Sequence, residues 1–221
     1  MTQHTSPTAR RILTIVATGL IAAAITLPTV RLAAAADTAS EAAPAAPAAP
    51  AEPTPSAEEQ EIIDWAFGLY EAAGLQLPDV AIGFYTTKEP CHGFKGYYEP
   101  REDGPDMVRV CDWHDKATLR DAWRRKTIVH ELAHSWTHAT LTLDERQAFA
   151  DHRGVDTWND YGYQWEDRAN EHASEIITWA LLDRPVRIDS RIGSDTCDEL
   201  ADGYRFLTGT EPANGLLQSC N

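Results

Sequence analysis

The sequence predicts an α+β domain in which a small antiparallel β-meander is followed by one long helix and further helices. Two observations lead to this prediction. Residues typical of strands, rich in Val, Ile, Phe and Tyr, are grouped within residues 80–111, whereas apolar residues with helical spacing lie before and after them. Strands that are grouped together, rather than alternating with helices, are typical of α+β proteins.

Each predicted element has its own local signal. Apolar stripes with the period of a helix, such as Ile62, Trp65, Ala66 and Leu69, define the helices. Proline and glycine between residues 100 and 105 separate the second strand from the third, and Asp, Asn and Gly make residues 154–164 a loop. The predicted strands are 80–86, 92–99 and 107–111, and the predicted helices are 57–73, 116–141, 143–151, 165–182 and 197–207.

Residues 1–36 have the pattern of a secretory signal peptide. Arg10 and Arg11 precede an apolar run over residues 12–30, and small residues up to Ala36 provide a cleavage site. Because a bilayer-spanning helix needs ~20 apolar residues, the alternative is an uncleaved anchor, and only that alternative makes the membrane a partner. Both interpretations place the folded part outside the cytoplasm, either secreted or in the cell envelope.

Residues 37–56 consist almost entirely of Ala, Pro, Glu, Ser and Thr. Such a composition cannot bury a hydrophobic core, so it predicts an extended linker with partial polyproline character. The remaining residues, 57–221, have an ordinary length for one domain, and every motif described below lies within them.

The chain is acidic, with 19 basic and 34 acidic residues and a formal net charge of −15. An acidic surface repels phosphate backbones, which excludes nucleic acid as a partner. The same balance predicts solubility and a mild preference for cationic ligands.

Four cysteines, Cys91, Cys111, Cys197 and Cys220, follow the predicted cleavage point. An even number of cysteines in an exported chain predicts two disulfides. The local pairing, Cys91–Cys111 and Cys197–Cys220, fits best because each pair encloses a short segment. A zinc–thiolate site is the alternative, but the sequence contains no Cys-x-x-Cys.

The sequence His130-Glu131-Leu132-Ala133-His134 lies inside the long predicted helix. Residues four apart share one helix face, so the imidazoles of His130 and His134 can reach a single ion at ~2.1 Å. Glu131 is one step around the helix, beside the metal, where it can take a proton from a metal-bound water. The motif therefore predicts one zinc ion per chain, with Glu131 as the catalytic base.

A zinc site with only two protein ligands would be weak, so we expect a third ligand. The helix over 165–182 contains Glu171 and Glu175, which are four residues apart and therefore on one face. One carboxylate can bind zinc while the other accepts a hydrogen bond from the free N–H of a zinc-bound histidine. Glu171 is the preferred ligand, and Glu175, Asp156 and Asp160 are the alternatives.

His138 continues the same helical row but is not a candidate ligand. It lies eight residues, or ~12 Å along the helix axis, from His130, which is too far for both to bind one ion. The metzincin pattern also fails, because Thr137 and Thr140 stand where that pattern has its glycine and its third histidine.

The two motifs together, His130-Glu131-Leu132-Ala133-His134 and Asn170-Glu171-His172-Ala173-Ser174-Glu175, resemble the gluzincin, or thermolysin-like, zinc metallopeptidases. The resemblance implies that His130, His134 and Glu171 bind zinc and that Glu131 activates the attacking water. It also implies that Glu175, standing where the family has Asp, orients a histidine, and that the strand over 107–111 offers an edge to an extended peptide. The spacing between the motifs is longer than in thermolysin, and the chain is too short for the usual C-terminal helical domain. It would be a minimal zincin-like form, with residues 57–221 as its metallopeptidase-like domain.

The expected function is that of a secreted zinc metallopeptidase which hydrolyses peptide bonds in peptides or proteins. The donor to the developing oxyanion stays open between Tyr161, Tyr163 and other groups. One alternative is an extracellular binding or structural module with non-catalytic zinc. Such a site would need a fourth protein ligand, and Glu131 would have no role in it. Another is a zinc hydrolase acting on a non-peptide amide of the cell envelope, which the sequence does not distinguish from a peptidase.

Overall fold

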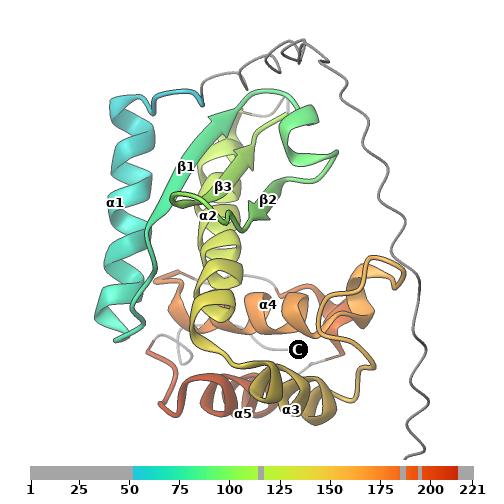
Figure 1. Cartoon of the computed structure of the whole chain (residues 1–221). Helices are drawn as coiled ribbons and strands as arrows, with labels where there is room; N and C mark the ends of the chain where they lie inside the picture. The colour runs from blue at the N-terminus through green and yellow to red at the C-terminus, as the bar shows by residue number, and fades with distance from the viewer. Residues whose placement is uncertain (1–51, 114–116, 185–187, 194–195, 214–221) are drawn as a thin grey trace, which may run out of the picture. The chain divides into compact units, whose positions relative to one another are not determined.

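The computed structural model describes residues 52–113, 117–184, 188–193 and 196–213. These ranges contain five α-helices and one three-stranded sheet, so the α+β class is confirmed (Figure 1). The predicted signal segment, residues 1–36, and most of the predicted linker lie outside the described residues. Among the described helices, none is both long enough and apolar enough to cross a bilayer.

The three strands form a mixed sheet rather than a meander. They are β1 (Val80–Tyr85), β2 (Gly96–Glu99) and β3 (Asp106–Cys111), in the spatial order β1-β3-β2. β1 pairs with β3 in parallel, and β2 pairs with β3 in the antiparallel direction. The prediction of an antiparallel β-meander is therefore wrong.

The burial of the strands explains this order. β3 carries a nearly continuous apolar run. Met107 and Val108 lie on opposite faces of this strand and both are fully buried, which is typical of a central strand. All four residues of β2 are only half-buried, which suits an edge. The expectation that the third strand would offer a free edge is wrong for the same reason, because β3 has a neighbour on each side.

The helices divide into a central pair and flanking members. They are α1 (Ala57–Ala72), α2 (Ala117–Thr140), α3 (Leu143–Arg153), α4 (Ala169–Leu181) and α5 (Cys197–Thr208). α2 packs on the sheet, on α1 and on α4, while α4 also packs on α3 and α5 (Figure 1). All 13 residues of α4 are buried, because α2, α3 and α5 pack around this helix.

α1 begins with a capping box, in which Ser56 and Glu59 each bond to the other's backbone N–H. Its apolar stripe faces inward, and the Tyr70 hydroxyl donates a 2.7 Å hydrogen bond to the carbonyl of Val129. This buried bond ties α1 to the part of α2 that carries the His-Glu-Leu-Ala-His motif.

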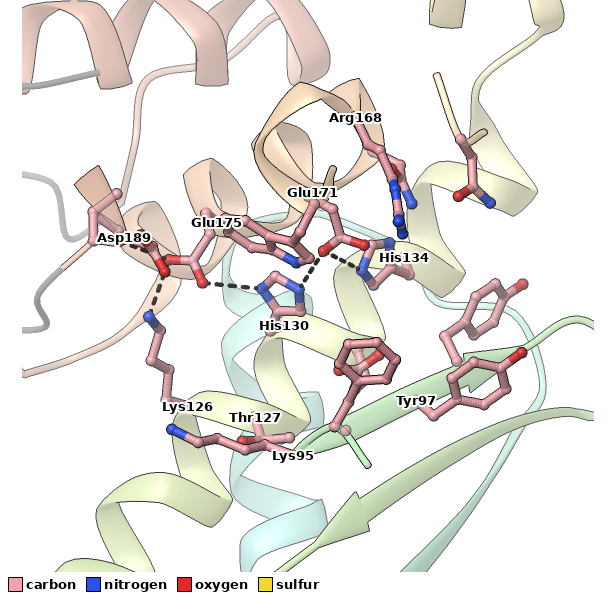
Figure 2. Close-up of a pocket in the computed structure, with 18 of the residues that line it drawn as sticks. Lys95, Tyr97, Lys126, Thr127, His130, His134, Arg168, Glu171, Glu175 and Asp189 are labelled. Atoms are coloured by element: carbon pink, nitrogen blue, oxygen red, sulfur yellow. Dashed lines mark hydrogen bonds and ion pairs between the residues drawn. The ribbon is translucent and has the colours of Figure 1, made fainter. Parts of the chain in front are cut away.

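The helix predicted over 165–182 is interrupted near its start. A 3₁₀ turn, η2 (Trp165–Asp167), is followed by Arg168 with extended backbone angles, and α4 begins only at Ala169. The extended backbone of Arg168 forms a bridge with Thr157, whose carbonyl accepts the N–H of Ala169 at 2.9 Å. The break sends the Arg168 side chain towards the cavity rather than along the helix surface (Figure 2).

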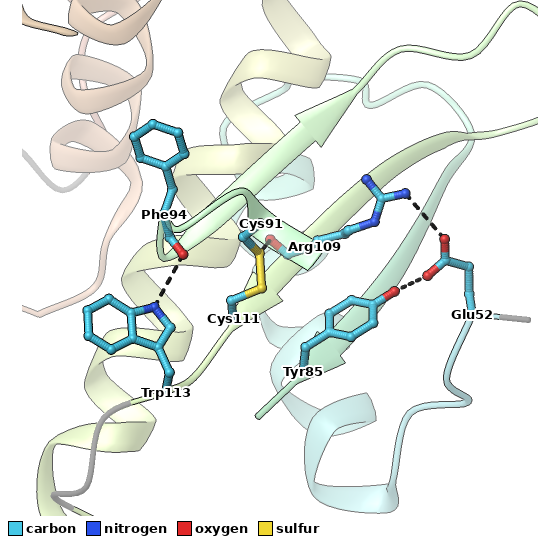
Figure 3. Close-up of a disulfide and its surroundings, with 7 residues drawn as sticks. All are labelled: Glu52, Tyr85, Cys91, Phe94, Arg109, Cys111 and Trp113. Atoms are coloured by element: carbon cyan, nitrogen blue, oxygen red, sulfur yellow. Dashed lines mark hydrogen bonds and ion pairs between the residues drawn. A yellow bond between two sulfur atoms is a disulfide. The ribbon is translucent and has the colours of Figure 1, made fainter. Parts of the chain in front are cut away.

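The predicted Cys91–Cys111 disulfide is confirmed, with a Cα–Cα distance of 6.1 Å (Figure 3). It joins the 3₁₀ turn η1 (Glu89–Cys91) to the last residue of β3, so it ties down the segment that leads into β2. On the same side of the sheet, Glu52 forms a 3.3 Å ion pair with Arg109 and accepts a hydrogen bond from Tyr85. The second predicted pair, Cys197–Cys220, ends on a residue outside the described ranges.

Replacing both Cys91 and Cys111 by alanine should lower the free energy of unfolding by about 3 kcal/mol, because the bridge closes a loop with a sequence separation of 20 residues. Urea unfolding of the double variant beside the parent protein would measure the change. An unchanged midpoint with an unchanged slope would contradict a stabilising role for this bridge.

Candidate metal centre

Two helices bring the three predicted ligands together. His130 and His134 project from α2, and Glu171 projects from the first turn of α4. Oε2 of Glu171 lies 3.2 Å from Nε2 of His130 and 3.3 Å from Nε2 of His134 (Figure 2). Tetrahedral zinc with ligands at ~2.1 Å requires donor atoms ~3.4 Å apart. The two separations from Glu171 are close to this value, and the group could hold a metal ion.

Among the described residues, this cluster has three members, whose potential ligand atoms all lie within 4.8 Å of one another. The side chains of His130, His134 and Glu171 are only 10–12 % exposed. Their exposed atoms line a cavity of about 1290 Å³. Three protein ligands next to an open cavity are typical of catalytic zinc sites, whereas structural sites are usually closed by four.

Glu175 lies one helical turn after Glu171 and contacts the other side of the His130 ring. Its Oε1 is 3.3 Å from Nδ1 of His130, while its Oε2 accepts a 3.0 Å bond from the ammonium of Lys126 and a longer one from the backbone of Asp189. A carboxylate on the second nitrogen fixes the orientation of a ligating imidazole. Glu171 and Glu175 therefore lie on opposite sides of the His130 ring, in the positions that their predicted roles require.

The electrostatics of the cluster follow from burial and pairing. Burial alone lowers the pKa of His130, but the Glu171 and Glu175 carboxylates outweigh it and raise this pKa to about 10. Burial alone raises the pKa of both carboxylates, yet the histidines, and Lys126 beside Glu175, hold both pKa values below the ordinary range, that of Glu175 at about 2. Both carboxylates are consequently ionised, as metal coordination and imidazole orientation require.

Glu131 is 7 % exposed and lines the same cavity. Burial raises the pKa of its carboxyl group, and His130 and His134 partly oppose that rise. Its carboxylate lies against β2 at Gly96, where an added Cβ would overlap both this carboxylate and the methyl group of Thr127. Position 96 therefore requires glycine, because any side chain there would overlap the Glu131 carboxylate.

The cavity has two distinct walls. β2 and the residues before it form one wall, in which the Tyr98 ring lies nearly parallel to His134 with centroids 6.3 Å apart. The loop between α3 and α4 contributes to the other wall through Trp158, Tyr161 and Arg168. A substrate at the metal centre would therefore lie between an edge strand and a loop.

The structure also shows which of the other candidate ligands and donors lie near the metal cluster. Neither Asp156 nor Asp160 belongs to the metal cluster or lines the cavity, and Asp160 instead accepts the N–H of Gly162 in a turn. Tyr161 lines the cavity, whereas Tyr163 does not. His138 borders the cavity but is not a member of the cluster.

Three contributors were not predicted from the sequence. Lys126 precedes His130 by four residues, so the helical rule that grouped His130 with His134 would also have found it. Gly96 and Arg168 carry no comparable signal, because their positions depend on strand packing and on the break before α4.

Replacing Glu171 by alanine should lower zinc affinity by at least about 100-fold, because it removes one of three ligands, and Glu175→Gln should lower it by about 10- to 100-fold. Zinc content and competition with a chromophoric chelator would measure both. Asp156→Ala, which removes an exposed carboxylate away from the cluster, is the matched control. Stoichiometric, tightly held zinc in Glu171→Ala would assign the third ligand elsewhere.

Metal-free protein should lose stability on both sides of a pH window. The folded-state pKa of His130, about 10, exceeds its unfolded value of about 6.5, so its stabilisation is complete below pH ~6.5 and is lost as the pH rises to about 10. The folded-state pKa of Glu175, about 2, is below its unfolded value of about 4.3, so its stabilisation is complete above pH ~4.3 and is lost on acidification.

Denaturant midpoints of chelator-treated protein across this pH range would test the window. Zinc-loaded protein is the control, because zinc replaces the proton on His130 and should remove the alkaline loss. A metal-free midpoint that stays constant between pH ~6.5 and ~10 would contradict the assigned coupling.

The chain was also compared with known proteins. No protein-family model, curated protein or solved structure matches it. The function therefore has to be inferred from the residues of the metal centre and its cavity.

Proposed function

We propose that this chain is an exported, zinc-dependent peptidase of the gluzincin type that hydrolyses peptide bonds in peptides or proteins. The observation that carries the proposal is the combination of a His130, His134 and Glu171 cluster with a buried glutamate, Glu131, in one large cavity. A site that only stabilised the fold would need neither the adjacent carboxylate nor the open cavity.

Zinc held by the three side chains would lower the pKa of a water ligand and polarise a substrate carbonyl. Glu131 would take the proton of the attacking water and return it to the leaving amine. Burial, which raises the pKa of Glu131 above the ordinary value, brings this carboxylate closer to the pKa of an effective base at neutral pH. Glu175 and Lys126 keep the His130 ring in its binding orientation throughout.

β2 supports a peptide as the substrate. It is an edge strand, and its residues line the cavity that contains the metal cluster. An extended peptide can add to such an edge through backbone hydrogen bonds, which places a backbone carbonyl next to the wall that contacts Glu131. Tyr161, on the opposite wall, is a candidate donor to that carbonyl oxygen.

Export is supported by the signal-like pattern of residues 1–36 and by the Cys91–Cys111 bridge. Disulfides persist mainly in oxidising compartments, such as the cell exterior or a periplasm. The proposed site of action is therefore the cell envelope or the surrounding medium.

Glu131→Gln should retain zinc but reduce peptide hydrolysis by about 10²- to 10⁴-fold, because the amide cannot accept the proton of water. The measurement is digestion of a mixed peptide library followed by mass spectrometry, with zinc content determined in parallel. Glu71→Gln, an exposed change of the same chemistry on α1, is the control.

Undiminished activity in Glu131→Gln would remove the proposed base. If the zinc-loaded parent protein cleaves no peptide, the proposal fails in favour of a binding module or a hydrolase of non-peptide amides.

A further inference from the structure

The charge of the cavity differs from that of the chain. The whole sequence has a formal charge of −15, yet the cavity wall carries seven Lys and Arg residues against four Asp and Glu residues. Three of these four acids, Glu131, Glu171 and Glu175, belong to the metal centre itself. A bound divalent cation would add further positive charge at the floor of the cavity.

Four of the cationic side chains are already paired with carboxylates of the protein. Each of them has a nitrogen within 3.3 Å of a carboxylate oxygen, so its charge is largely compensated. They are Arg125, Lys126, Arg184 and Arg191. Arg146, a fifth cation, donates to the carbonyls of Thr137 and His138 at the end of α2, so it serves as a helix cap.

Lys95 and Arg168 differ from the other five. Among the described residues, no carboxylate forms an ion pair with either side chain, and both are half-buried in the cavity wall. The Lys95 ammonium lies 3.2 Å from the centroid of the Trp123 ring, and burial together with Lys126 lowers the pKa of Lys95, which Asp189 opposes only in part. Arg168 uses Nε and Nη2 to bind the carbonyl of Tyr163, which leaves Nη1 free to meet a ligand.

These two cations lie at opposite ends of the metal centre. Lys95 precedes Gly96, which contacts Glu131, and it is close enough to Lys126 at the Glu175 end to be influenced by its charge. Arg168 lies three residues before Glu171, and its guanidinium lies near His134 and Glu171 (Figure 2). A peptide that crosses the metal centre would therefore pass, on each side of the bond to be cleaved, one cation that forms no ion pair with a described carboxylate.

We propose that the cavity selects substrates with carboxylate groups next to the cleaved bond, bound by Lys95 on one side and Arg168 on the other. The carboxylates are those of Asp or Glu side chains, or the terminal carboxylate of a short peptide. This inference rests on the proposed peptidase function, and it assigns to that function an acidic class of substrate. Charge-assisted hydrogen bonds in a partly desolvated cavity supply the selectivity.

Peptides that differ only in the residues flanking the cleaved bond, Glu, Gln or Lys, test the proposal with the zinc-loaded full chain. Each peptide is used with a free and with an amidated C-terminus. We expect kcat/KM to fall by about tenfold from Glu to Gln and further for Lys, and the preference to shrink at about 1 M salt, where the Debye length is ~3 Å. A preference confined to free C-termini identifies the terminal carboxylate as the group bound.

Lys95→Gln and Arg168→Gln should each reduce the ratio of kcat/KM for Glu and Gln peptides by about three- to tenfold. Arg125→Gln removes a cavity cation that is already paired with Asp121, so it should leave the ratio unchanged. Because Arg168 also holds the Tyr163 carbonyl, Arg168→Lys serves as a second variant that keeps the charge and should retain most of the preference. Zinc content and circular dichroism check that each variant is folded.

Equal cleavage of Glu, Gln and Lys peptides, or a preference that survives in both Gln variants, would overturn the inference while leaving the peptidase function intact. If no peptide is cleaved, fluorescence anisotropy with the same peptides decides the matter. Tighter binding of the Glu peptide would then support a cavity selective for carboxylates and reject the peptidase function, whereas equal binding of all three peptides would reject both proposals.

Discussion

The complete burial of α4 is the constraint on which the metal centre depends. Carboxylates on a buried helix are largely removed from water, so each needs a partner that compensates its charge. α2 supplies the partners from one face, with Lys126 and His130 at Glu175 and with His130 and His134 at Glu171. The pairing sets how the two helices lie against each other, so the forces that stabilise the helix packing also assemble the site.

Local geometry made much of this site predictable. Residues four apart on a helix share a face whatever surrounds them, so His130 with His134 and Glu171 with Glu175 could be grouped from sequence alone. Whether the histidine pair meets the glutamate pair depends on the fold. The sequence indicated that they meet only because two acids in an apolar helix require partners. The strand order was not predictable in this way. Three short strands satisfy a meander and the observed order equally well, and only the burial of β3 on both faces decides between them.

Composition was least informative about the cavity. A net charge is a sum over the whole surface and contains no information about where each sign is exposed. Here most of the cavity cations come from segments distant in sequence, the residues before β2, the start of α2 and the break before α4, and the fold gathers them around one opening. The extended backbone of Arg168 illustrates the difficulty, because helical periodicity continues across this position and gives no sign of the break.

The Cys91–Cys111 bridge also separates two parts of the domain that can differ in how readily they accept amino-acid substitutions. The covalently closed segment between the two cysteines contains the edge strand and the cavity wall with Lys95, while the metal ligands lie on helices outside it. Substitutions within this segment can alter what the cavity accepts without altering how it holds metal. Gly96 must stay small for Glu131 to fit, and the buried residues of β3, such as Met107 and Val108, are fixed by core packing. The half-buried and exposed positions of the enclosed segment are thus the ones suited to exchange, in evolution or in design, around an unchanged candidate metal centre.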